Sequence, residues 1–318
     1  MTYRKLFIVG CPRSGTGWLT RMIGDHPNIL KVPSESHAYS VTYNNFTYLK
    51  NQDLKKRFRS FRSAKWIYKS YGLKPLLFGI ESEDLWQGVL KQYKIFQNSK
   101  EKVGLHRLVN YTELEQLIAK VRSGSEDDLT KVRNLNQLMF DSFFEKNGGT
   151  EKDILLEKTP QHLRYIDVIL NQFPEAKSIE IIRDVCVSYQ ARAKSVRWAR
   201  QSTKSVIKTW KKAIEKVERV KGDPKIGDRI YSVSYENLHT HPQEELSKIF
   251  DFIGLDYEQA LIDEIIDGTD ISKVKNKGEG QHIRKGSIGE WQTRLSAEDI
   301  ALWQELAGDT LARLGYFT

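Results

Sequence analysis

A short glycine-rich segment near the start of the chain carries the residues best suited to holding an anion. Gly10 and Gly15 enclose four residues, among them Arg13 and Ser14. A short apolar run precedes the segment, as a buried strand would, and a helical pattern follows it. The backbone amides of such a loop, together with the positive end of the following helix, cradle anionic oxygens. The segment therefore predicts a phosphate-binding loop between a strand and a helix.

The spacing of the two glycines is that of a nucleoside-triphosphate P-loop, but two important P-loop residues differ. A P-loop continues after its second glycine with a lysine and then a serine or threonine, whereas Thr16 and Gly17 stand here. The chain thus lacks the lysine that reaches the terminal phosphates and the hydroxyl that holds magnesium. Arg13 supplies a cation inside the loop instead. We expect an anionic ligand bound without a metal ion, and a P-loop kinase is the weaker alternative.

Two more charged side chains follow strand-like runs further along the chain. Residues 153–157 lead into Lys158, and residues 178–182 lead into Arg183. A fourth such run covers residues 229–235. Strands that alternate with helices predict a parallel sheet, and ligands bind at the carboxyl ends of its strands. We therefore expect an α/β, P-loop-like three-layer fold, with a central parallel sheet flanked by helices.

The size and composition of the chain fit a single globular domain. It has 318 residues, of which 39% are hydrophobic, and it contains no apolar run near the ~20 residues that span a bilayer. We expect residues 1–318 to form one domain, with the aromatic and basic segment 36–110 inserted as a cap over the substrate. Two cysteines and the lack of a signal-peptide-like run predict a cytoplasmic location.

The basic residues are concentrated in two segments, which bears on the partners of the protein. The net charge is +9, and residues 50–69 and 192–221 hold the basic excess. Such clustering indicates contact with an anionic glycan or a membrane surface, and we expect no nucleic acid partner. A solvated helix face is the alternative. A non-enzymatic anionic-glycan binder is a further alternative function, although it would not need loop motifs at three strand ends.

Motifs spread over nearly the whole chain resemble the sulfotransferase family that uses 3'-phosphoadenosine 5'-phosphosulfate (PAPS). The resemblance is to bacterial, carbohydrate and tyrosylprotein sulfotransferases. It implies transfer of a sulfuryl group from PAPS to a hydroxyl of a carbohydrate, lipid or other small molecule, by in-line displacement and without a metal. The matching segments, in family order, are residues 11–16, 26–27, 156–160, 181–184, 235–238, 252–255 and 284–291.

The resemblance also implies roles for individual residues. Glu35 would take the proton of the acceptor, with His37 as the alternative base, while Lys158 and Arg13 would stabilise the departing phosphate. The donor would be bound by Pro12, Arg13, Ser14, Gly15, Thr16, Gly17, Trp18, Arg183, Ser188, Tyr235, Arg284, Lys285 and Gly286. Ser188 follows Arg183 more closely than in the family and the proline of that loop is absent, so the loop is shorter here.

Overall fold

The structure is a computed structural model of the chain, and its secondary structure falls into two compact units. The first unit comprises Met1–Lys31 and Glu151–Thr318, and the second comprises Val32–Thr150. The first unit contains the sheet and the second is helical. The residues that the structure describes are 3–43, 46, 81–184, 202–270, 288–289 and 295–316.

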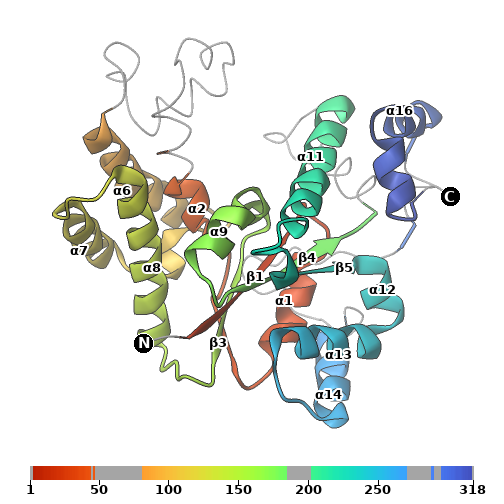
Figure 1. The fold of residues 1–318 in the computed structure, drawn as a ribbon, viewed down its shortest axis with the longest axis horizontal. Coiled ribbons are helices and arrows are strands. Elements are labelled where there is room, and N and C mark those ends of the chain that lie inside the picture. Colours follow the sequence, from red (N-terminus) through yellow and green to blue (C-terminus); the bar gives the residue numbers. More distant parts are fainter. Residues whose placement is uncertain are drawn as a thin grey trace. The chain divides into compact units, whose positions relative to one another are not determined.

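The first unit is built on a five-stranded sheet in the order β2-β3-β1-β4-β5 (Figure 1). Every neighbouring pair is parallel, and β1 occupies the centre. The central strands are buried along almost their full length, because helices cover both faces of the sheet. The strands are β1 (Arg4–Gly10), β2 (Ile29–Lys31), β3 (Ile154–Lys158), β4 (Lys177–Ile182) and β5 (Ile230–Ser234).

Four helices cover one face of the sheet. Their apolar side chains form one cluster with inward-facing strand residues such as Leu6, Ile8 and Ile179. Because alternate residues of a strand face opposite sides, the same face also receives Leu156. These helices are α1 (Thr16–Gly24), α12 (Tyr235–Thr240), α13 (Pro242–Ile253) and α14 (Gln259–Thr269).

The opposite face of the sheet is covered by a second set of helices (Figure 1). Phe7 of β1 stacks on Phe173 there, with ring centroids 6.1 Å apart. Trp210 and Trp303 join the two outer helices of the set edge to face. The members are η3 (Pro160–Tyr165), α9 (Ile166–Gln172), α11 (Thr203–Lys221), η4 (Gly227–Arg229) and α16 (Ala297–Arg313). The predicted three-layer α/β fold with a central parallel sheet is therefore confirmed.

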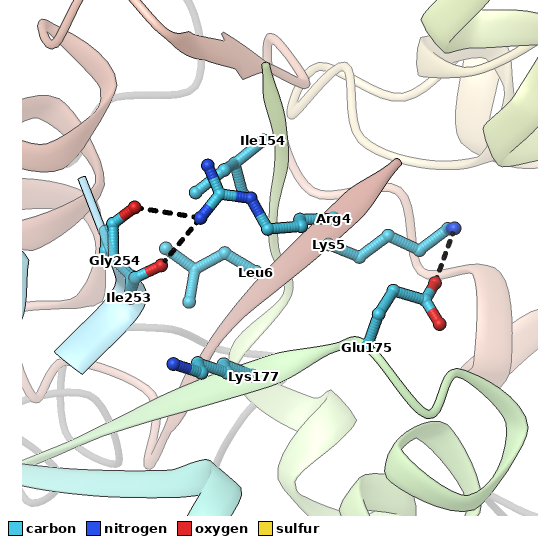
Figure 2. Close-up of a pocket in the computed structure, with 8 residues that line it drawn as sticks. All are labelled: Arg4, Lys5, Leu6, Ile154, Glu175, Lys177, Ile253 and Gly254. Carbon is cyan, nitrogen blue, oxygen red and sulfur yellow. Dashed lines mark hydrogen bonds and ion pairs between the residues drawn. The ribbon is translucent and has the colours of Figure 1, made fainter. Parts of the chain in front are cut away.

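The amino-terminal edge of the sheet contains a cavity of about 110 Å³ (Figure 2). Arg4 Nη1 donates to the carbonyls of Ile253 and Gly254, at 3.2 and 2.8 Å, where α13 ends. Lys5 points to the other side of β1 and donates to Glu175 at 3.2 Å. The guanidinium of Arg4 thus satisfies carbonyls that the end of a helix leaves open. These cations anchor the sheet edge opposite to the one that carries the glycine-rich loop.

The second unit is made of helices. Asn110 caps α7 by accepting a hydrogen bond from the Glu113 amide at 2.9 Å, and Asp127 caps α8 in the same way. The helices are α2 (Ala38–Val41), α6 (Ser82–Gln97), η2 (Leu105–Arg107), α7 (Tyr111–Arg122) and α8 (Asp128–Lys146). Across the described parts of both units, no helix is long and apolar enough to cross a membrane.

Candidate functional site

The glycine-rich loop connects β1 to α1 at the carboxyl edge of the sheet. The Ser14 amide donates to the Cys11 carbonyl at 3.1 Å, which closes a turn, and Arg13 and Gly15 have φ values of +81° and +103°. Gly15 stands at the N-cap of α1 and has no side chain that could cap the first amides of the helix. The positive end of α1 therefore faces this loop with donors that an anion would satisfy.

Close packing explains why the loop needs glycine at its two ends. A Cβ atom on Gly10 would lie 2.7 Å from both the Ile181 carbonyl oxygen and Ser14 Oγ. A Cβ atom on Gly15 would lie 2.5 Å from Cδ2 of Tyr235. Both distances are shorter than van der Waals contact, so a larger residue would displace the loop.

Ser14 is a second sign that the loop suits an anionic ligand. Its side chain is buried, and Ser14 Oγ has no hydrogen-bond partner among the described residues. Buried polar atoms are almost always hydrogen-bonded, so an orphan hydroxyl in a loop of this kind is explained by a ligand oxygen. The donors of Ser14 and of the first turn of α1 together fit a phosphate or sulfate group.

Lys158 lies at the carboxyl end of β3, next to the loop in the sheet. It pairs in register with Ile8 of β1, two residues before Gly10. Paired residues of parallel strands face the same side, so the Lys158 side chain leaves the sheet on the Ile8 side, which α1 covers. The sequence predicted Lys158 just past the end of a strand, and the structure makes it the last residue of β3. The lysine stands on the same face as the helix that the loop precedes.

Arg183 lies just beyond β4, and its guanidinium stacks on the ring of Tyr235, which in turn lies beside the glycine-rich loop. Its guanidinium carbon is 3.9 Å from the centroid of the Tyr235 ring, a cation–π contact. Tyr235 is buried at the start of α12, and its ring also packs against Gly15. Trp18 of α1 packs edge to face on the same ring at 5.4 Å. Tyr235 thus brings together four of the predicted donor-binding residues, itself included.

Glu236 holds the segment that follows Arg183. Its Oε1 accepts a hydrogen bond from the Asp184 amide at 2.9 Å, and its Oε2 accepts one from the Tyr316 hydroxyl at 3.0 Å. Burial, together with the nearby Glu236 charge, raises the pKa of Tyr316 well above its usual range. Tyr316 is therefore a permanent donor. Sequence reasoning gave Glu236 no role, although its place two residues after the end of β5 was a usable signal.

A buried polar cluster flanks Lys158. Glu157, Thr159 and His162 are 1%, 0% and 0% exposed. Thr159 Oγ1 donates to Glu157 Oε1 at 2.6 Å, and His162 Nδ1 lies 2.9 Å from Glu157 Oε2. The sequence gave no sign of the parts played by Thr159 and His162, because the turn from β3 into η3 is what brings both side chains back to Glu157.

Glu35 and His37, the two candidate bases, lie in the second unit. His37 Nε2 is 3.2 Å from Glu35 Oε2, and its ring stacks on Phe96 with centroids 5.3 Å apart. The Glu35 carbonyl accepts a hydrogen bond from the Gly104 amide at 2.8 Å. His37 is at the N-cap of α2 with a φ of +53°. The two residues thus form a contacting pair, whereas the sequence presented them as alternatives.

Cys11 follows β1 directly, and its chemistry is that of a buried thiol. It packs in a cluster with Val206 and Trp210 of α11. Burial, and to a smaller extent the charge of Glu180, raises its pKa to about 12. A thiol with such a pKa is a poor nucleophile at neutral pH. Among the other residues predicted to bind the donor, Pro12 lies in the glycine-rich loop, and Thr16 and Gly17 lie in the first turn of α1. Four more lie outside the described part of the chain, namely Ser188, Arg284, Lys285 and Gly286.

Comparison with known proteins links this geometry to one family. A family model described as the sulfotransferase family matches residues 5–259. A mouse sulfotransferase, SULT7A1, whose crystal structure is complexed with PAP, is 14% identical, with a TM-score of 0.54 over 98% of this chain and 84% of that chain. Sulfotransferase STF9 from Mycobacterium avium is also 14% identical, with a TM-score of 0.50 over 98% and 77% of the two chains. At these identities the two structures establish a shared fold.

Proposed function

This chain belongs to the sulfotransferase family and is a PAPS-dependent enzyme, and we propose that it sulfates a hydroxyl of a carbohydrate, lipid or other small molecule by in-line displacement. The observation that carries the proposal is the loop between β1 and α1. The first turn of α1, whose N-cap residue is a glycine without a capping side chain, meets the buried Ser14 hydroxyl there, and this hydroxyl has no hydrogen-bond partner among the described residues. Both fit the 5'-phosphate of the donor.

Two parts of the first unit suit the two ends of the donor. The start of α1, Ser14 and Thr16 suit the 5'-phosphate. Arg183 suits the 3'-phosphate, because a guanidinium binds a phosphate with two parallel hydrogen bonds. The stacking of Arg183 on Tyr235 limits its rotamers before the ligand arrives. From the family resemblance we place four further residues at the 3'-phosphate, namely Ser188, Arg284, Lys285 and Gly286.

The bound donor supplies the sulfuryl group and a phosphate leaving group. Lys158 and Arg13 would stabilise the negative charge that develops on the bridging oxygen as its bond to sulfur breaks. The acceptor oxygen forms the new bond to sulfur from the opposite side, and its proton passes to Glu35. General-base transfer of this kind requires a carboxylate within hydrogen-bond reach of the hydroxyl. His37 holds the carboxylate through the 3.2 Å contact and is the alternative base.

Ligand-induced stabilisation tests the donor assignment. Adenosine 3',5'-bisphosphate at a hundredfold excess over its Kd should raise the melting temperature by roughly 5 °C, because it binds only the folded protein. ATP with magnesium should have a much smaller effect, and turnover should persist in EDTA. A larger shift with Mg-ATP would favour a P-loop kinase. Stabilisation by heparin without any response to the bisphosphate would favour a non-enzymatic glycan binder.

The basic segment 192–221 supports a contact with an anionic partner. Its described part includes α11, where the exposed residues Lys204, Lys208 and Lys212 follow one another at intervals of four along one face. We propose that this row contacts an anionic glycan or a membrane surface rather than nucleic acid. Residues 36–110 are proposed as the acceptor cap of a single catalytic domain, and the cytoplasmic location stays a prediction.

A further inference from the structure

A buried, hydrogen-bonded carboxyl group lies at the carboxyl end of β3. Glu157 is an acidic residue inside the sheet, and both of its carboxyl oxygens are bonded by residues that follow it in the chain. Thr159 and His162, which make those bonds, are themselves completely buried. A buried carboxylate costs several kcal/mol unless hydrogen bonds replace its lost hydration. The bonds from Thr159 and His162 therefore replace part of the hydration that the carboxyl group has lost.

The cluster fixes the backbone on both sides of Lys158. The hydrogen bond from Thr159 to Glu157 joins the residues on either side of Lys158. Glu157 is itself held in the sheet by its pairing with Phe7. The bond from His162 ties the first turn of η3 to the same carboxylate. Pro160 at the start of η3 restricts the chain further, because its ring fixes φ.

A fixed backbone matters for Lys158 because of the side chain that it carries. A lysine has four rotatable bonds, and holding its ammonium at one point costs conformational entropy. Fixing the Cα–Cβ direction removes the backbone motion of the attachment point, so that only the side-chain rotations remain to be restricted when the donor binds. Glu157 and Lys158 are adjacent in the strand, so the cluster occupies one face of the sheet and Lys158 leaves from the other. The cluster can therefore hold Lys158 without competing for its ammonium.

We propose that Glu157, Thr159 and His162 form a buried positioning cluster that holds Lys158 ready for the 5'-phosphate end of the donor. The inference rests on the proposed role of Lys158 in the sulfuryl transfer. The three residues act through Lys158 and touch neither donor nor acceptor.

An isosteric pair at Thr159 tests the cluster with little change of shape. Thr159→Val removes the donor to Glu157, and Thr159→Ser keeps it. We expect Thr159→Val to weaken adenosine 3',5'-bisphosphate by about three- to tenfold, the scale of one hydrogen bond. Thr159→Ser should restore nearly all of the affinity. Calorimetric titration gives the Kd, and melting curves confirm that each variant is folded. Equal affinity for the two variants would overturn the proposal.

A double-mutant cycle separates positioning from general stabilisation. In a Lys158→Ala background, Thr159→Val should change the Kd by less than about twofold, because the group that it positions is gone. The same three- to tenfold loss in both backgrounds would overturn the proposal. An unchanged Kd in Lys158→Ala alone would instead refute the role of Lys158, and the inference with it. If Lys158→Ala weakens the bisphosphate but Thr159→Val does not, the role of Lys158 stands and only the positioning cluster is refuted.

A second pair at His162 provides an independent readout. His162→Asn keeps an N–H donor near the position of Nδ1, whereas His162→Gln moves it one bond further from the backbone. The asparagine variant should retain more affinity for the bisphosphate than the glutamine variant. The reverse order would contradict the contact between Nδ1 and Glu157 as the positioning bond.

Discussion

Tyr235 shows how a single side chain can organise a binding site without carrying any of its charge. Its ring supports the guanidinium of Arg183 on one side and contacts Gly15 and Trp18 on others. The sequence marked all four residues, but the stacking that joins them depends on the turns after β4 and β5. Residue types were therefore predictable here and their mutual contacts were not.

The proposed role of Arg183 at the 3'-phosphate needs a direct test, because the loop that follows it is shorter than in the family. We expect Arg183→Ala to weaken adenosine 3',5'-bisphosphate by about tenfold or more, since a charge-assisted hydrogen bond contributes roughly 1.5–3 kcal/mol. Affinity for 5'-AMP, which has no 3'-phosphate, should change little. Calorimetry with both ligands measures the difference. Equal losses would remove Arg183 from the 3'-phosphate site, and Lys204→Ala on the exposed face of α11 is a control for charge alone.

Glu35 and His37 can be assigned separate roles by kinetics. Glu35→Gln keeps the shape of the side chain and removes its basicity, so turnover should fall by about a hundred- to ten-thousandfold. Affinity for the bisphosphate should stay the same. An acidic acceptor such as 4-nitrophenol, which ionises without help, should recover part of the rate. If Glu35→Gln remains active and His37→Ala does not, the histidine is the base.

At the scale of elements, the loop between β1 and α1 offers a matched pair of glycines. Gly15→Ala should destabilise the protein by about 1–3 kcal/mol or more, because alanine is strained at a φ of +103° and its Cβ would meet Tyr235. A Cβ atom on Gly17 would have no neighbour within 4 Å, so Gly17→Ala should be neutral or stabilising. Urea unfolding without ligand measures both effects. Similar losses in the two variants would contradict the packing described for Gly15.

Strand β4 carries a buried acid that should make stability depend on pH. Burial raises the pKa of Glu180 from its usual 4.5 to about 7, against the opposing effects of the Ser232 hydrogen bond and the Lys221 charge. The folded protein then binds a proton that the unfolded chain has already lost. Stability from this group is present below pH 4.5 and is lost as the pH rises through about 7, by on the order of 3 kcal/mol.

The variant Glu180→Gln isolates that contribution. Its free energy of unfolding should exceed that of the wild type at about pH 8 and depend less on pH between about 5 and 8, because glutamine carries no titrating proton. Urea titrations at several pH values give the comparison. Parallel curves for the two proteins would mean that Glu180 keeps its ordinary pKa in the folded state.

The elements also show what the sequence could predict about the fold. Short apolar runs placed β1, β3 and β4 nearly where they are, because burial on both faces leaves a nearly continuous apolar signal. The half-buried β5 was placed from a run in which apolar and polar residues mix. Strand β2 was missed, because three residues are too short for any period to show. The buried cluster beside Lys158 was missed for another reason, since a polar residue in a strand gives no sign of its partner.

At the scale of the molecule, the strands that are neighbours in the sheet are far apart in the sequence. Central β1 pairs with β3, which begins at Ile154, and with β4, which begins at Lys177. Apart from the turn within the glycine-rich loop, the loop packs on Ile181 of β4 and on Tyr235, both of which come much later in the chain. The glycine-rich motif alone therefore does not make a binding site, and the tertiary structure of the whole first unit does.

This strand order also determines when, during synthesis, each strand can find its partner. A ribosome adds about 5–20 residues per second, so β4 leaves it roughly ten to thirty seconds after β1. The first strand that can pair with β1 is β3, which emerges shortly before β4, so for most of that interval the apolar residues of β1 remain a target for chaperones or for other nascent chains. A chain interrupted before β4 has only one of the two strands that flank β1, and it also lacks Arg183 and Tyr235 of the proposed donor site.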